Sequence, residues 1–110
     1  MYEYIAKVNR VVDGDTFDLA VDVGFDVIVK ERFRLAGVDT PETWRPRNEA
    51  EKAHGLKATA AVKELIEGKD ILVTTYKADK YKRYLCDIKV EGLDLAEFLV
   101  ANELVKLETY

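Results

Sequence analysis

Cysteine and long apolar runs are both scarce in this chain. Among 110 residues there is a single cysteine, Cys86, so neither an internal disulfide nor a cluster of metal-binding thiolates can form. No apolar run approaches the ~20 residues that a membrane-spanning helix needs. The first residues also lack the basic and apolar regions of a signal peptide. We therefore expect a soluble, cytoplasmic protein that does not contact a membrane.

An excess of positive charge is also missing. Lysine and arginine number 17 against 21 acidic residues, which gives a net charge of −4. That balance argues against a protein that coats nucleic acid through charge alone. The charges are uneven, however, because residues 77–89 hold five basic against two acidic side chains, whereas residues 91–110 hold one against five. The net charge therefore says little about the field at any one site.

What the chain does have is enough apolar sequence for one domain, residues 1–110, with 48% hydrophobic residues. Alternating apolar residues and turn signals predict five main strands, over residues 2–12, 17–22, 27–35, 70–76 and 83–90. Helices are predicted over 49–67 and 94–102, with Asp94 as the N-cap of the second. We expect a further small strand over 104–107.

The order of these elements predicts the fold class. Within the long helix, the expected buried face is Ala53, Leu56, Ala60 and Leu65–Ile66, although Gly55 weakens the helical pattern. A βββαββα order fits a mainly β (α+β) protein, in which one long and one short helix pack on a five-stranded barrel. The OB-fold is the commonest such plan, and an α+β sandwich is the competing layout.

Acidic side chains stand where the predicted strands begin and end. Asp15 follows the Asp13-Gly14 turn, while Asp39 and Glu42 lie where the third strand runs out at Thr40-Pro41. Taken alone, Asp15 is better explained as a turn residue, and Asp39 is equally explained as a loop-capping residue. If the first three strands form an antiparallel meander, however, the three carboxylates can converge. Such a set of oxygen donors would suit Ca²⁺ or Mg²⁺.

Two arginines could add phosphate chemistry to such a site. Arg34 lies between apolar neighbours in the third strand, and Arg83 begins the fifth after a charged run. Taken alone, each is better explained as a solvated surface arginine. Beside a hard metal ion, two guanidinium groups would bind phosphate oxygens and neutralise charge in a transition state. Glu42 would then be available to position or deprotonate a water molecule.

Three segments of the chain resemble a known family. They are Val12–Phe17 (VDGDTF), Arg34–Glu42 (RLAGVDTPE) and Asp79–Arg83 (DKYKR). In this order they are similar to the signature segments of the staphylococcal nuclease (thermonuclease-like) family, and the resemblance extends from about Ala6 to Leu107. It implies an OB-fold and Ca²⁺-dependent hydrolysis of phosphodiester bonds in DNA or RNA.

The resemblance also implies a role for each matching residue. The implied roles are calcium ligands (Asp15, Asp39 and the Thr40 carbonyl), catalytic residues (Arg34 and Arg83 on the scissile phosphate, Glu42 as general base) and nucleotide contacts (Lys80 and Tyr81). The family pattern usually has glycine where this chain has Lys82. Secreted members are also strongly basic, whereas this chain is acidic, so its binding to nucleic acid should be weaker.

Other interpretations of the same residues remain open. The alternative function is a non-catalytic module of the same fold that binds nucleic acid or a protein. We expect a monomer, or a homodimer paired through the C-terminal side. His54 and Cys86 are predicted to be structural, whereas Tyr76 and Tyr84 could stack on bases or simply pack at the edge of the sheet.

Overall fold

The computed structural model describes residues 1–78, 80, 81 and 83–110. The prediction about Lys82 therefore lies outside the described residues. The described part of the chain forms strands β1 (Tyr2–Asp13), β2 (Thr16–Asp22), β3 (Ile28–Leu35), β4 (Asp70–Tyr76), β5 (Tyr84–Val90) and β6 (Leu93–Asp94), with helices α1 (Glu49–Ile66) and α2 (Leu95–Ala101). All five predicted main strands and both helices are present, and Asp94 caps α2 by accepting a hydrogen bond from the Glu97 N–H.

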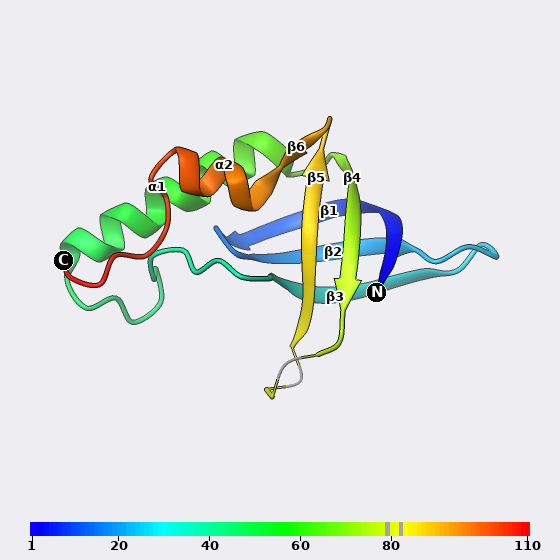
Figure 1. The fold of residues 1–110 in the computed structure, drawn as a ribbon, viewed down its shortest axis with the longest axis horizontal. Coiled ribbons are helices and arrows are strands. Elements are labelled where there is room, and N and C mark those ends of the chain that lie inside the picture. Colours follow the sequence, from blue (N-terminus) through cyan, green and yellow to red (C-terminus); the bar gives the residue numbers. More distant parts are fainter. Residues whose placement is uncertain (79, 82) are drawn as a thin grey trace.

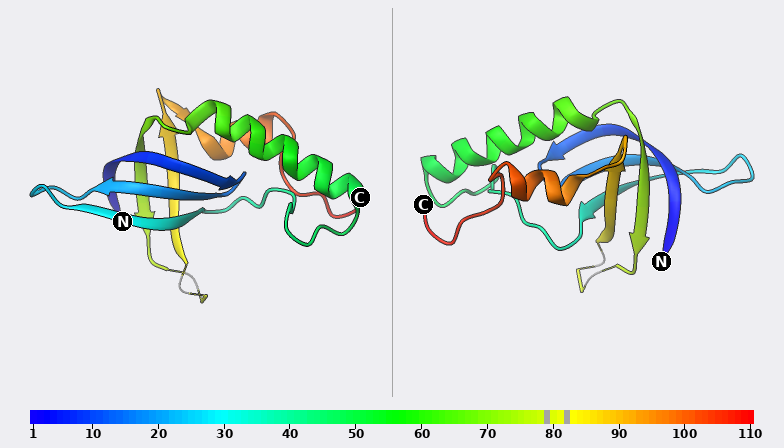
Figure 2. Two further views of the ribbon diagram at one scale, coloured as in Figure 1. Left: turned by 180° about the vertical axis from the view of Figure 1, so that it is seen from behind. Right: turned by 45° about the horizontal axis from the view of Figure 1, so that its top comes forward.

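The strands close into a barrel of the OB-fold type, as predicted. Their order is β3-β2-β1-β4-β5-β6, and a parallel pairing of β3 with β5 closes the sheet, with the short β6 beside β5. Both helices lie on one side of the barrel, and the β2–β3 and β4–β5 hairpins project away from them (Figures 1 and 2). This closure brings the third and fifth strands, which are far apart in sequence, side by side.

The core forms between the barrel and the two helices. Alternate residues of the strands point inward, as the period of two requires. The largest fully buried apolar side chains are Val8, Val11, Phe17, Leu19, Leu35, Val62, Ile66, Val73, Ile88, Leu95 and Leu99. Cys86 is buried among them, as predicted, and burial raises the pKa of its thiol to about 12. No helix in the described part of the chain is long and apolar enough to cross a membrane.

The predicted buried face of α1 was wrong. The residues that α1 buries are Glu51, Gly55, Ala58, Val62 and Ile66. Of the expected face, Ala53 and Ala60 are exposed, Leu56 is 54% exposed, and Ile66 alone is fully buried. Apolar residues surround much of this helix, so periodicity could not select one face. The barrel and the loop before the helix selected a face that contains a glycine and a glutamate.

The predicted strand over 104–107 is also absent. Leu104 is buried, but residues 104–110 form no strand, and the backbone bends at Val105 and Glu108. The Lys106 N–H instead donates to the Asp39 carbonyl at 2.9 Å. The segment therefore packs against the loop after β3 and returns toward the start of α1 (Figure 1).

Candidate active site

The β1–β2 turn and the loop after β3 pack directly on each other. The Leu35 N–H donates to the Asp15 carbonyl at 2.8 Å, and the Thr40 N–H donates to Asp15 Oδ2 at 3.0 Å. A Cβ on Gly14 would lie 2.8 Å from Thr40 Cγ2, closer than such atoms pack. Glycine is therefore what lets the turn meet the loop. The strand ends therefore meet, but of the three carboxylates predicted to converge only Asp15 and Asp39 share a partner, Arg34, whereas Glu42 lies near Lys106.

Arg34 lies between the two aspartates of the proposed site. Its Nη2 atom is 3.4 Å from Asp15 Oδ2, and the same nitrogen donates to Asp39 Oδ1. Pairing of β2 with β3 places Thr16 opposite Arg34, which aims the arginine at the turn. The Asp15 side chain is 10% exposed and that of Asp39 is 65% exposed. One buried and one accessible carboxylate therefore face a single cationic nitrogen.

The pKa values of Asp13 and Asp15 are shifted in opposite directions, so at mildly acidic pH Asp13 is protonated while Asp15 is ionised. Burial raises the pKa of Asp13 to about 7, and the hydrogen bond and negative charge of Asp15 also raise it. Burial would raise the pKa of Asp15 as well, but hydrogen bonds from Asp13 and the Thr40 N–H, together with the Arg34 charge, lower it. The pair therefore keeps its negative charge on Asp15, the residue that faces Arg34.

Asp15 and Asp39 are the side chains here that could contribute oxygen donors to a hard divalent cation, and this role stays a prediction. Asp15 and Asp39 already meet at one positive group, the Arg34 guanidinium. Among the described residues, no cluster of three or more His, Cys, Asp and Glu side chains could hold a metal. A cation here would thus have two carboxylates and backbone or external oxygens, a set that Ca²⁺ accepts. That the Thr40 carbonyl joins them stays a prediction.

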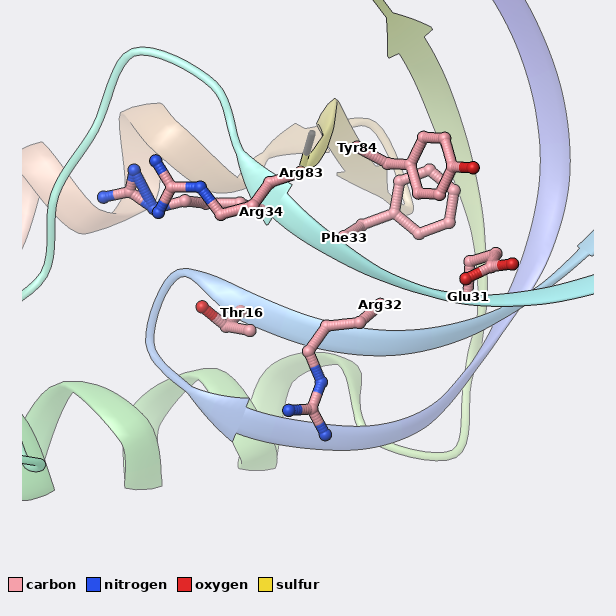
Figure 3. A pocket seen from close by; sticks show the side chains of 7 residues that line it. All are labelled: Thr16, Glu31, Arg32, Phe33, Arg34, Arg83 and Tyr84. Atoms are coloured by element: carbon pink, nitrogen blue, oxygen red, sulfur yellow. The ribbon is translucent and has the colours of Figure 1, made fainter. Parts of the chain in front are cut away.

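Arg34 and Arg83 line the same pocket, which has a volume of about 260 Å³. The residues that line it are Thr16, Glu31, Arg32, Phe33, Arg34, Arg83 and Tyr84. Because β3 and β5 run parallel with Phe33 opposite Tyr84, the residues Arg34 and Arg83 flank this pairing. Figure 3 shows both guanidinium groups extending toward the same end of the pocket. The structure therefore brings together two arginines that lie 49 positions apart in the sequence.

Lys80 and Tyr81 lie in the turn between β4 and β5. The Tyr81 ring is 66% exposed, with Lys80 Nζ 5.1 Å and Arg83 Cζ 5.2 Å from its centroid. These cation–π contacts place the ring beside one of the pocket arginines. The turn therefore presents an aromatic ring and two cations on one exposed tip.

Glu42, the predicted general base, lies in the loop that leads from β3 to α1. Its carboxylate is 47% exposed and lies 3.9 Å from Lys106 Nζ. The Glu42 N–H points in the other direction, at 3.4 Å from Glu51 Oε2. The backbone at Glu42 is thus tied to α1, while its side chain remains partly open to water.

Glu51 is the main site residue that the sequence analysis missed. Its side chain is fully buried and accepts hydrogen bonds from Arg47 N at 2.8 Å, Arg47 Nε at 3.2 Å and the Glu42 N–H. Lys106 Nζ lies 3.6 Å away. These donors, the Arg47 N–H first, outweigh burial and lower the pKa of Glu51 to about 2. Glu51 therefore joins the Glu42 loop, the start of α1 and the C-terminal segment.

A signal for Glu51 was present in the sequence. The N-cap of α1 is Asn48, whose Oδ1 accepts from the Glu51 N–H at 3.0 Å. Asn followed three residues later by Glu is the spacing of a capping box. In this protein the glutamate reaches beyond the cap to the backbone of the preceding loop, so the motif would have located the helix start but not the residue's partner.

Comparison with known proteins finds a matching family and several related sequences. The model of the family described as staphylococcal nuclease homologue matches residues 32–108. A protein of Escherichia coli O157:H7 named "Uncharacterized endonuclease" is 30% identical over 95 residues, which are 86% of this chain and 54% of that protein. A "Probable staphylococcal-like nuclease CAN1" of Oryza sativa subsp. japonica is 33% identical over 75 residues, 67% of this chain and 20% of that protein. The chain thus spans about half the length of the first of these relatives and a fifth of the second.

Proposed function

Because this chain belongs to the staphylococcal nuclease homologue family, we propose that it is a Ca²⁺-dependent nuclease that hydrolyses phosphodiester bonds of DNA or RNA. The observation that carries the proposal is one pocket that holds both Arg34 and Arg83, with the Asp15–Asp39 pair on Arg34. The names of the E. coli and rice relatives support the same class of reaction.

Asp15, Asp39 and the Thr40 carbonyl would hold the calcium ion. When bound, the ion supplies positive charge that stabilises a developing phosphorane-like oxyanion. Asp15 enters this role already ionised, because Asp13 and the Thr40 N–H donate to it. The exposed Asp39 carboxylate leaves one side of the position open to solvent and substrate.

The two arginines and Glu42 would carry the remaining chemistry. Arg34 and Arg83 bind the phosphate oxygens with their guanidinium forks, which match phosphate geometry. Glu42 takes a proton from the attacking water as the new P–O bond forms. The P–O bond to the leaving sugar oxygen breaks, and that oxygen takes up a proton from solvent. For this, the Glu42 carboxylate must exchange its exposed contact with Lys106 for a water molecule.

A cleavage assay tests the proposal. Supercoiled plasmid and denatured DNA should be degraded with added Ca²⁺, and EDTA should stop the reaction in both cases. Nicked or linear plasmid as the first product would identify endonucleolytic cleavage. No Ca²⁺-stimulated cleavage of either substrate would contradict the nuclease assignment, and binding of single strands without cleavage would favour the non-catalytic module.

Replacing the proposed base provides the residue-specific test. Glu42→Gln should lower kcat by about 10²–10⁴-fold, the usual contribution of general base catalysis. The free energy of unfolding should change little, because the 3.9 Å contact with Lys106 is exposed. The matched control is Glu49→Gln, an exposed glutamate in the first turn of α1, which should keep full activity. Equal activities of the two variants would exclude Glu42 as the base.

A further inference from the structure

The pocket that holds the two arginines has an aromatic wall at its other end. Phe33 and Tyr84 stand opposite each other in the parallel β3–β5 pair, and their ring centroids are 5.7 Å apart at an interplanar angle of 39°. Phe33 is 6% exposed, whereas Tyr84 is 46% exposed. Figure 3 shows the two rings overlapping at the end of the pocket away from the guanidinium groups. An exposed ring is thus supported from behind by a buried one.

This wall is rigid because of where the fold places it. Phe33 lies near the end of β3 and Tyr84 is the first residue of β5, so the strand pairing that closes the barrel also fixes the two rings. Contact with Phe33 restricts the Tyr84 ring before any ligand arrives. A pre-ordered ring loses little conformational entropy on binding. The face of Tyr84 is therefore suited to stacking.

The charge of the pocket selects the class of ligand. Three arginines and one glutamate line it, namely Arg32, Arg34, Arg83 and Glu31, although the whole chain is acidic. Arg32 is paired with Asp18 at 2.8 Å and Arg34 with Asp15 and Asp39, while Arg83 lines the same pocket. A ligand with an anionic group at one end and a flat aromatic group at the other fits this arrangement, and a nucleotide is such a ligand.

We propose that Tyr84, supported by Phe33, forms a nucleobase subsite that stacks on the base of the nucleotide joined to the phosphate at Arg34 and Arg83. The subsite rests on the proposed function, because the arginines fix the phosphate to which that nucleotide is attached. It differs from the predicted contact at Tyr81, which is not among the residues that line the pocket. Stacking on an aromatic face tolerates any base, so this subsite adds affinity without choosing a sequence.

Binding of a tetranucleotide without cleavage tests the subsite. The measurement is the Kd of thymidine tetranucleotide, and of its abasic counterpart, in the Glu42→Gln background with Ca²⁺ present. Tyr84→Ala should weaken binding of the normal strand by about 5- to 150-fold, the range expected for loss of one stacked base. Tyr84→Phe keeps the ring and should restore the affinity. The abasic strand should bind Tyr84→Ala and the Glu42→Gln background protein with the same Kd.

The control variant is Tyr2→Ala, which removes another exposed tyrosine that also contacts a neighbouring ring, Tyr4, but does not line this pocket. It should leave the Kd unchanged. Unchanged affinity of Tyr84→Ala for the normal strand, equal losses on both strands, or no binding of the tetranucleotide would each overturn the subsite. Cleavage by the wild-type protein with unchanged affinity of Tyr84→Ala would contradict the subsite alone. Binding that depends on Tyr84 without any cleavage would contradict the nuclease assignment alone.

Discussion

Two acidic side chains that are shielded from water have pKa values shifted in opposite directions, depending on how many hydrogen-bond donors surround each one. Asp13 lies beside another carboxylate, and burial raises its pKa to about 7. Glu51 accepts from two backbone N–H groups and the Arg47 side chain, and its pKa is lowered to about 2. The number and charge of the donors thus decide the ionisation of a buried acid, and burial alone does not.

Glu51 should make the stability of the protein depend on acid pH. Because its pKa in the folded state is about 2 and its ordinary value is 4.5, the unfolded chain binds this proton more tightly. The stabilising contribution is therefore fully present above about pH 4.5 and is lost as the pH falls toward 2. Urea unfolding of wild type and Glu51→Gln between pH 2 and pH 7 measures it, and the difference between the two proteins should shrink on acidification.

The control for that experiment is a glutamate that lies away from the groups that face Glu51. They are Arg47 and the Glu42 backbone from the loop and helix start, and Lys106 from the C-terminal segment. Glu64→Gln changes a glutamate near the other end of α1 that is exposed to solvent, so its stability should follow wild type at every pH. A constant difference between Glu51→Gln and wild type over the whole range would contradict the lowered pKa.

At the scale of elements, one glycine, Gly55, allows α1 to pack closely against the loop that precedes it. A Cβ at Gly55 would lie 2.6 Å from the Pro41 carbonyl oxygen and 3.0 Å from that of Glu42. Gly55 is therefore required by close packing, although glycine lowers helix propensity. The backbone that carries Glu42 lies directly against the helix at this point.

Gly55→Ala should lower both stability and activity. Helix propensity alone favours alanine by about 1 kcal/mol, but overpacking against backbone typically costs about 1–3 kcal/mol. We expect a net loss of about 1 kcal/mol in the free energy of unfolding, and lower kcat because the Glu42 backbone is displaced. Thermal unfolding and the cleavage assay measure the two effects.

A substitution at an exposed position of the same helix separates the effect of helix propensity on stability from the effect of packing. Ala60→Gly should cost about 0.5–1 kcal/mol of stability through helix propensity and should leave kcat unchanged, since Ala60 is exposed. A Gly55→Ala protein that is more stable than wild type, with full activity, would show that the loop moves aside without cost.

For the whole molecule, the acidic net charge and the basic pocket would affect the proposed binding of nucleic acid at different ranges. The net charge of −4 gives no general attraction for a polyanion. If the proposed function holds, attraction would arise at short range from Arg34 and Arg83 in the pocket and from Lys80 on the neighbouring turn. Few phosphates should therefore be contacted at once.

The salt dependence of binding follows from that small number of contacts. Three phosphate contacts predict a slope of about −2 for log K against log salt concentration on single-stranded DNA. Lys80→Ala should reduce the magnitude of the slope by about 0.7, whereas Lys57→Ala, exposed on α1, should not change it. Titrations at several NaCl concentrations with Ca²⁺ fixed measure both slopes, and a much steeper wild-type slope would indicate a larger contact surface.

The sequence by itself determined the elements and the identities of the charged residues. Alternating apolar residues and the Asp13-Gly14 turn were sufficient to predict the strands, because the spacing of apolar residues and the residue types of a turn are local properties of the sequence. The segment from Arg34 to Glu42 likewise indicated a site at the end of β3. Local sequence could not choose the buried face of α1, since apolar residues lie around most of that helix.

Only the tertiary structure decided which distant residues meet. Closure of the barrel by β3 and β5 placed Arg83 and Tyr84 beside Arg34 and Phe33, and no local pattern encodes a pairing across 50 residues. The partners of Glu51 were decided in the same way, because they come from the helix start, the preceding loop and the C-terminal segment. Packing also explained Gly55, which the helical pattern alone disfavours.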